Sequence, residues 1–106
     1  MEQNADKTKV MFRKFSDGEI IALFPELFEK NDCCLSYMHI GQHSAASYEL
    51  VHDTELANET EYKPLYDELE TLGYNLQVCK RLTEKMKTNA YQAYLQSWLK
   101  SLPKAC

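Results

Sequence analysis

The sequence contains few residues that break regular structure and no segment that could cross a membrane. Glycine and proline each occur three times in 106 residues, which argues against a wholly disordered chain. No run of about 18 apolar residues is present, so no transmembrane helix is expected. The N-terminal stretch "MEQNADKTK" lacks the apolar region of a secretory signal, and we expect residues 1–8 to form a flexible arm.

The cysteines lack the spacing of a disulfide framework or of a zinc site. Two of the four are adjacent and one is the last residue: Cys33, Cys34, Cys79 and Cys106. Such a pattern does not predict a disulfide scaffold, and no Cys-x-x-Cys pair is present for zinc. We therefore expect reduced thiols in a cytoplasmic protein, with neither a metal nor another cofactor.

The net charge of −4 conceals an asymmetry along the chain. Residues 1–79 carry fifteen acidic and six basic side chains, whereas residues 80–106 carry six basic side chains and one acidic side chain. An acidic body with a basic C-terminal segment bears on the choice of partners rather than on the fold.

The apolar fraction of 44% and the charged fraction of 26% are those of an ordinary globular domain. The stretch "KVMFRKFSDGEIIALF" predicts a β-hairpin, since Asp17-Gly18 supplies turn residues between two β-prone runs. Pro25 cannot donate to a ladder and is expected to end the second strand, so that "ELFEKNDCC" becomes a loop. Residues 34–40 predict a third strand, which breaks at Gly41 into the polar loop "GQHSAAS".

The second half of the chain predicts two helices and one more strand. Residues 48–54 form either a short strand or a helical turn. Asn58 and Glu61 have the spacing of a capping box, and Gly73 follows as the residue after the helix. Pro64 implies that this helix starts later than the box or is kinked. Residues 74–82 alternate like a strand, and Thr83 caps a helix over residues 84–101 that Pro103 stops.

These elements predict an α+β fold with a mainly antiparallel sheet of four or five strands in the order β-β-β-(β)-α-β-α. Because the helices are few, we expect both to cover one face of the sheet. We divide the chain into the arm (1–8), a core domain (9–82) and an amphipathic C-terminal helix (83–106) that packs on the core or on a partner.

Three blocks, "VMFRKFSDGEIIALFPEL", "CLSYMHIGQHSAASYELV" and "EYKPLYDELETLGYNLQVCKRLT", carry a resemblance over about three quarters of the chain. In this order they resemble a family of small uncharacterised bacterial proteins found on phages, plasmids and other mobile elements. The resemblance implies no catalytic residues. It implies a setting in which small proteins bind host or rival components.

We interpret the chain as a non-enzymatic interaction protein that binds a protein partner. Loops carry function more often than scaffolds, so the first candidate contacts are Gln42, His43 and Ser44. The second group is the aromatic stripe of the C-terminal helix: Tyr91, Tyr94 and Trp98. Seven apolar residues over about four turns are broad for one packing face, which favours a homodimer or partner contact there.

Two other functions remain open. Nucleic acid could bind to the basic segment, whose candidate phosphate contacts are Lys80, Arg81, Lys85 and Lys87. A small hydrolase or metalloprotein could use His39, His43 and His52 with Cys33 and Cys34, but no signature of either class surrounds them. The break at Gly41 also separates His39 from His43, so their spacing of four does not predict a shared helical face.

Overall fold

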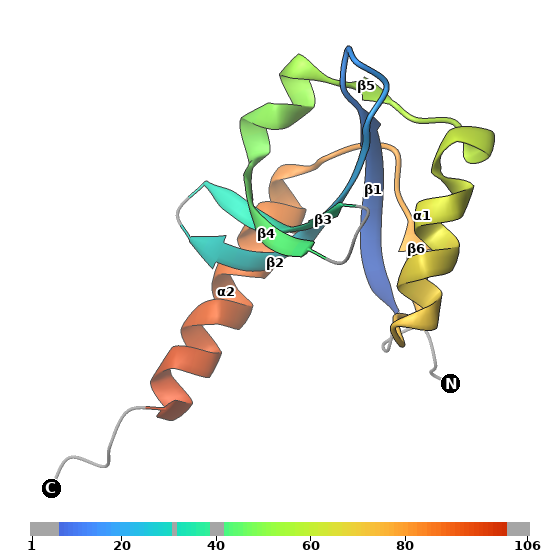
Figure 1. Cartoon of the computed structure of the whole chain (residues 1–106). Coiled ribbons are helices and arrows are strands. Elements are labelled where there is room, and N and C mark those ends of the chain that lie inside the picture. Colours follow the sequence, from blue (N-terminus) through green and yellow to red (C-terminus); the bar gives the residue numbers. More distant parts are fainter. Residues whose placement is uncertain (1–6, 31, 39–41, 102–106) are drawn as a thin grey trace, which may run out of the picture.

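The computed structural model describes residues 7–30, 32–38 and 42–101. The elements follow in the order β1 (Thr8–Lys14), β2 (Ile20–Lys30), β3 (Cys33–Met38), β4 (Gln42–Ser47), η2 (Tyr48–Asp53), β5 (Glu55–Leu56), α1 (Glu59–Thr71), β6 (Leu76–Val78) and α2 (Glu84–Ser101). The α+β prediction is confirmed, with two long helices beside one sheet (Figure 1). Residues 1–6 of the predicted arm lie outside the described residues, and Thr8 already belongs to β1.

The sheet has six strands, most of which pair antiparallel in the order β4-β3-β2-β1-β5. The N-terminal half of β1 pairs with β6, and this pairing is parallel, whereas its C-terminal half pairs antiparallel with β5. The predicted hairpin between β1 and β2 is confirmed, with Gly18 in its turn at a φ of +94°. Such a positive φ costs glycine little because it has no Cβ.

The expected end of β2 at Pro25 is wrong. The strand continues to Lys30, and its register with β3 shifts between Phe24 and Phe28 and again between Phe28 and Lys30. Such irregularities are where a strand accommodates a residue without an N–H. The Pro25 carbonyl also accepts a hydrogen bond from the Tyr48 hydroxyl at 2.9 Å, so this buried bend is fastened to η2.

The prediction of a loop after Gly41 is also wrong for the residues that the structure describes there. Residues 42–47 form β4, which pairs with β3 over six consecutive positions, although residues 39–41 lie outside the described residues. Serine and alanine have weak β-propensity, so pairing with β3 decides the conformation here. The following residues, 48–53, form a 3₁₀ helix rather than a strand, and the Ser47 hydroxyl caps it by accepting from the Glu49 N–H at 3.1 Å.

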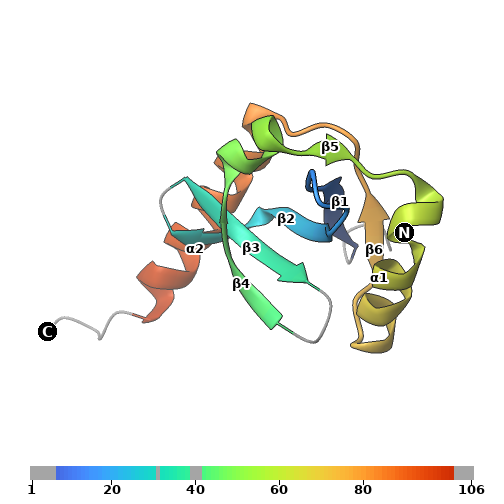
Figure 2. The same ribbon diagram turned by 45° about the horizontal axis from the view of Figure 1, so that its top comes forward.

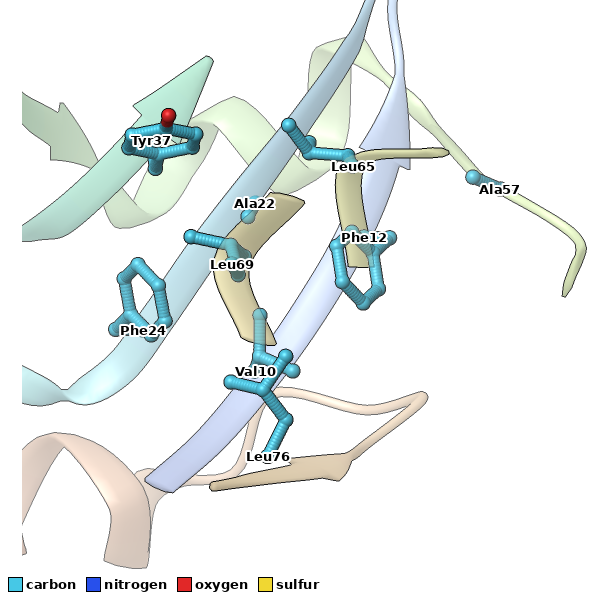
Figure 3. Close-up of a cluster of buried hydrophobic side chains, with 9 residues drawn as sticks. All are labelled: Val10, Phe12, Ala22, Phe24, Tyr37, Ala57, Leu65, Leu69 and Leu76. Atoms are coloured by element: carbon cyan, nitrogen blue, oxygen red, sulfur yellow. The ribbon is translucent and has the colours of Figure 1, made fainter. Parts of the chain in front are cut away.

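The sheet buries side chains on both of its faces. On one face Leu65 and Leu69 of α1 pack against β1, β2 and β3 in a cluster (Figure 3): Val10, Phe12, Ala22, Phe24, Tyr37, Ala57, Leu65, Leu69 and Leu76. The second cluster contains the intervening residues of these strands together with Tyr48 of η2: Met11, Ile21, Leu23, Cys34, Ala46 and Tyr48.

The expectation that both helices cover one face therefore needs correction. Leu82, which directly precedes the cap of α2, packs against the second cluster, and the Lys87 ammonium lies over the Tyr48 ring. The start of α2 thus lies on the face opposite α1. The continuous apolar run of β2 demands this arrangement, since Ile21 and Leu23 alternate with Ala22 and Phe24 and both sets need cover.

The local signals at the helix ends are confirmed. The Asn58 side chain accepts from the Glu61 N–H at 2.9 Å, and the Glu61 carboxylate accepts from the Asn58 N–H at 2.9 Å. The helix α1 begins at Glu59, as the capping box requires, and runs through Pro64, so the alternative of a later start is wrong. Gly73 follows it with a φ of +108°. Neither α1 nor α2 has the combination of length and apolar character that crossing a bilayer requires.

Candidate interaction surface

The helix α2 is anchored to the body of the protein through its first two turns. The Thr83 hydroxyl caps it by accepting from the Met86 N–H at 3.2 Å. Met86 and Ala90 are buried, and the Asn89 amide donates to the Glu26 carboxylate of β2 at 3.1 Å. These contacts fix the direction of the helix against the C-terminal half of β2.

The C-terminal half of α2 extends away from the sheet (Figures 1 and 2). Four of its large side chains are between 43% and 53% exposed: Tyr91, Tyr94, Trp98 and Leu99. We call these four residues the α2 aromatic surface. Their spacing of three, four and one places them along one side of a helix with 3.6 residues per turn. An exposed apolar stripe of this kind is typical of a contact with another molecule.

Phe28 of β2 supports the root of this surface. Its ring centroid lies 4.5 Å from that of Tyr94 and 5.7 Å from that of Tyr91. Both distances fall within the range in which aromatic pairs attract each other. The tyrosines are therefore held in position by the sheet while almost half of each side chain faces outward. The sequence does not mark Phe28 as part of this surface, because residues 26–34 were expected to form a loop, whereas Phe28 belongs to β2.

The aromatic surface belongs to a stretch of helix without charge. No charged side chain occurs from Thr88 to Leu99, and Lys100 is the next. A helix that projects into water normally carries charged residues on its exposed sides, whereas protein interfaces are depleted of charge at their centre and enriched in aromatic residues. The composition of this half-helix is therefore that of an interface.

The first predicted group of partner contacts lies elsewhere, in β4. The His43 Nε2 atom and the Tyr74 hydroxyl are 2.8 Å apart, and the His43 ring packs against Tyr37 with a centroid distance of 4.7 Å. Ser44 is exposed, and the side chain of Gln42 lies outside the described residues. The prediction of a recognition loop at these positions is replaced by an edge strand.

Three of the predicted nucleic-acid contacts line one hollow of about 490 Å³. Lys80, Arg81 and Lys87 surround it together with Tyr48 and His52 of η2. Glu49 and Glu84 line it as well, and the Glu84 carboxylate lies 3.4 Å from the Lys87 ammonium. The predicted contact Lys85 is not part of the lining. Acidic side chains thus offset part of the positive charge.

The cysteine and histidine candidates for catalysis do not form a site among the described residues. No group of three or more potential metal ligands occurs in the described ranges, and His39 lies outside them. His43 and His52 belong to different elements, β4 and η2. Cys34 is buried, and burial raises the pKa of its thiol to about 12. A thiol that stays protonated at neutral pH is a poor nucleophile.

Comparisons with known proteins assign no family to this chain. No family model matches it, and neither the curated proteins nor the solved structures contain a match.

Proposed function

We propose that this chain is a non-enzymatic interaction protein that binds another protein through the α2 aromatic surface. The observation that carries the proposal is the exposure of Tyr91, Tyr94, Trp98 and Leu99 on a half-helix without charge. Tyrosine and tryptophan are the residues that most often dominate binding energy at protein interfaces.

The exposed area of the α2 aromatic surface is large enough to form a substantial part of a protein interface. A fully covered aromatic side chain buries 150–250 Å², so three such residues at about half exposure offer roughly 300 Å². A standard interface takes roughly 800 Å² from each partner. The aromatic surface would therefore supply more than a third of such an interface, and its flanks would supply the rest.

The setting of the proposal comes from the resemblance to small proteins of mobile elements. We propose a host or rival protein in the cytoplasm as the partner, with an anti-defence or regulatory outcome. Self-association through α2 is the competing use of the same surface, since two copies would cover each other's aromatic side chains.

The test compares the wild type with a Tyr94→Ala, Trp98→Ala variant in light scattering and in capture of proteins from a host lysate. The matched control is Gln92→Ala, Gln96→Ala, which truncates two exposed polar residues of the same half-helix. Circular dichroism must show that all three proteins are folded. The proposal expects an association that the aromatic variant loses and the control keeps. The proposal would be contradicted if light scattering showed the wild type to be a monomer and if both variants captured the same proteins from the lysate as the wild type.

A second candidate function is nucleic-acid binding at the hollow near the start of α2. It is favoured by the convergence of Lys80, Arg81 and Lys87 around one hollow beside the Tyr48 ring. Phosphate contacts make affinity fall steeply as salt rises. The test is the binding of single- and double-stranded oligonucleotides between low and moderate salt, with Lys80→Ala, Arg81→Ala as the variant. Affinity that does not change with salt would eliminate this candidate.

A further inference from the structure

The strand β4 ends the sheet and leaves one side of its backbone open. The sheet order places β3 on one side of β4, and among the described residues no strand follows on the other side (Figure 2). The strands at the opposite edge of the sheet are shorter than β4, because β5 has only two residues and β6 only three. With six residues, β4 is long enough to template a further strand.

The register shows which backbone groups of β4 point outward. Ser36 lies opposite Ser44, and the Ser36 hydroxyl donates to the Ser44 carbonyl at 2.9 Å, so this carbonyl points toward β3. Backbone groups alternate in direction along a strand. The N–H and C=O groups of His43, Ala45 and Ser47 therefore point away from β3. The Ala45 carbonyl accepts a long bond of 3.3 Å from the neighbouring Ser44 hydroxyl.

The edge lacks the features with which proteins prevent strand pairing. Natural edge strands are protected by lysine, proline, bulges or an inward-pointing charge. The sequence of β4 is "QHSAAS", without proline or a formally charged residue, and its register with β3 runs without interruption. The side chains of Ser44, Ala45 and Ala46 are small, so they do not obstruct the backbone of an added strand that pairs with β4.

A mainly apolar hollow of about 350 Å³ lies over the face of the sheet on the inner side of this edge. Ser36 of β3 and residues 44–47 of β4 line it together with the apolar side chains of Phe15, Ile21, Met38 and Leu50. Of these, Phe15, Met38 and Leu50 are only partly buried, so the hollow presents apolar surface that no described side chain fills completely. An added strand places every second side chain on the same face of the sheet, within reach of such a hollow.

We propose that β4 binds an extended peptide segment of another protein as an additional strand, with one large apolar side chain of the peptide seated in this hollow. This is the mode in which main-chain hydrogen bonds supply affinity and side-chain hollows supply specificity. The site is separate from the α2 aromatic surface, and neither proposal depends on the other.

The chemistry of β4 argues for a foreign peptide rather than a second copy. On the face of the hollow, β4 itself offers only Ser44 and Ala46 as described side chains, because these residues lie opposite Ser36 and Cys34. A second β4 paired at this edge would therefore leave the hollow unfilled. Exposed Asp32 lies at the Ser47 end of the strand, where its carbonyl accepts from the Tyr48 N–H, and its charge favours a basic residue at the corresponding end of the peptide.

The experiment selects binders of the full-length protein from a random displayed decapeptide library and measures their affinity by calorimetry. Two variants test the two parts of the site, which are the outward backbone groups of β4 and the hollow. Ala45→Pro removes an outward N–H and leaves the groups that face β3, whereas Ser44→Leu fills the hollow from within the chain. The matched controls are Ala45→Thr, which keeps the N–H, and Ser44→Ala, which keeps the hollow open. Circular dichroism checks the fold of each variant.

The proposal expects enriched peptides with alternating β-branched residues and one invariant Leu, Ile, Met or Phe. Because Ala45→Pro loses a main-chain bond and leaves its peptide acceptor unpaired, and Ser44→Leu closes the seat of a buried side chain, binding should weaken at least about tenfold in both variants but not in the controls. Peptides that bind both variants as tightly as the wild type, or no enrichment at all, would overturn the proposal. A dimer that Ala45→Pro dissociates and Trp98→Ala does not would show that a second copy takes the edge instead.

Discussion

The Arg13 side chain ties the central part of the sheet to Thr54 through two hydrogen bonds at the end of η2, and a third reaches the Val51 carbonyl. Its Nε donates to the Thr54 hydroxyl at 3.0 Å, and its Nη2 donates to the Thr54 carbonyl at 2.5 Å and to the Val51 carbonyl at 2.9 Å. The Thr54 hydroxyl in turn donates to the Leu50 carbonyl at 2.9 Å. One guanidinium thus satisfies the carbonyls at the end of a 3₁₀ helix that would otherwise lack partners.

Replacing Arg13 with lysine should destabilise the fold although the charge is kept. A lysine ammonium is a point donor and cannot reproduce the planar fork that reaches both carbonyls and the hydroxyl. Hydrogen bonds that involve a charged group contribute about 1.5–3 kcal/mol, so we expect a loss of about 2 kcal/mol in the free energy of unfolding. Urea denaturation measures it. Arg81→Lys is the control, because Arg81 is exposed and should change stability by less than about 0.5 kcal/mol. Equal stability of the two variants would contradict this role of Arg13.

The ion pair between Lys14 and Glu61 should make stability depend on pH in the acid range. The hydrogen bond from the Lys14 ammonium is the main cause that lowers the pKa of Glu61, and the Asn58 N–H adds to it. A carboxylate whose pKa is lower in the folded state stabilises the fold above its unfolded pKa, and this contribution disappears as the pH falls through the folded pKa. The same pair raises the pKa of Lys14, so the contribution of Lys14 is lost only at alkaline pH.

The variant Glu61→Gln tests this dependence. The glutamine oxygen can still accept from the Asn58 N–H and complete the capping box, whereas the charge opposite Lys14 is lost. The variant should unfold at lower urea than the wild type at neutral pH, and the difference should vanish once the pH falls below the lowered pKa of folded Glu61. Glu59→Gln, in the same turn of α1, serves as the control for helix-dipole effects. A difference that persists at acid pH would show that packing, rather than charge, is responsible.

Replacing Pro64 with alanine should stabilise the protein. Pro64 lies at the sixth position of α1, is exposed, and offers no N–H to the Thr60 carbonyl. Proline in a helix interior costs up to about 3 kcal/mol relative to alanine, so the melting temperature should rise by several degrees. The control Thr60→Ala gains helix propensity alone and should change stability less. An unchanged or lower melting temperature would mean that the contacts of Pro64 beside Gly18 and Ile20 outweigh the missing bond.

The helix caps and the glycine turns were predicted correctly from the sequence. The capping box of Asn58 and Glu61, the cap at Thr83 and the glycine turns at Gly18 and Gly73 all satisfy backbone groups only a few residues away. Such interactions need no information about the rest of the chain. The stripe of Tyr91, Tyr94 and Trp98 was likewise visible from its helical spacing.

Features that depend on distant partners were predicted wrongly or missed. Pro25 signals a strand end locally, yet β2 continues because β3 pairs with the residues beyond the bend. The stretch "QHSAAS" has the composition of a loop, yet it becomes β4 because β3 supplies its hydrogen-bond partners. The hollow beside β4 joins residues from five elements or turns and could not be read from any one of them.

The sequence by itself determined the two long helices, their caps, the β-hairpin and the absence of charge from residues 88–99 of α2, since all of these follow from neighbouring residues. Only the tertiary structure decided which faces of the sheet the helices cover and which strand lies at its edge. It also decided that Phe28 and the buried Ala90 anchor α2 while its aromatic residues stay exposed. The physical reason is that strand pairing and the burial of both faces of β2 are non-local, so their outcome depends on the whole chain at once.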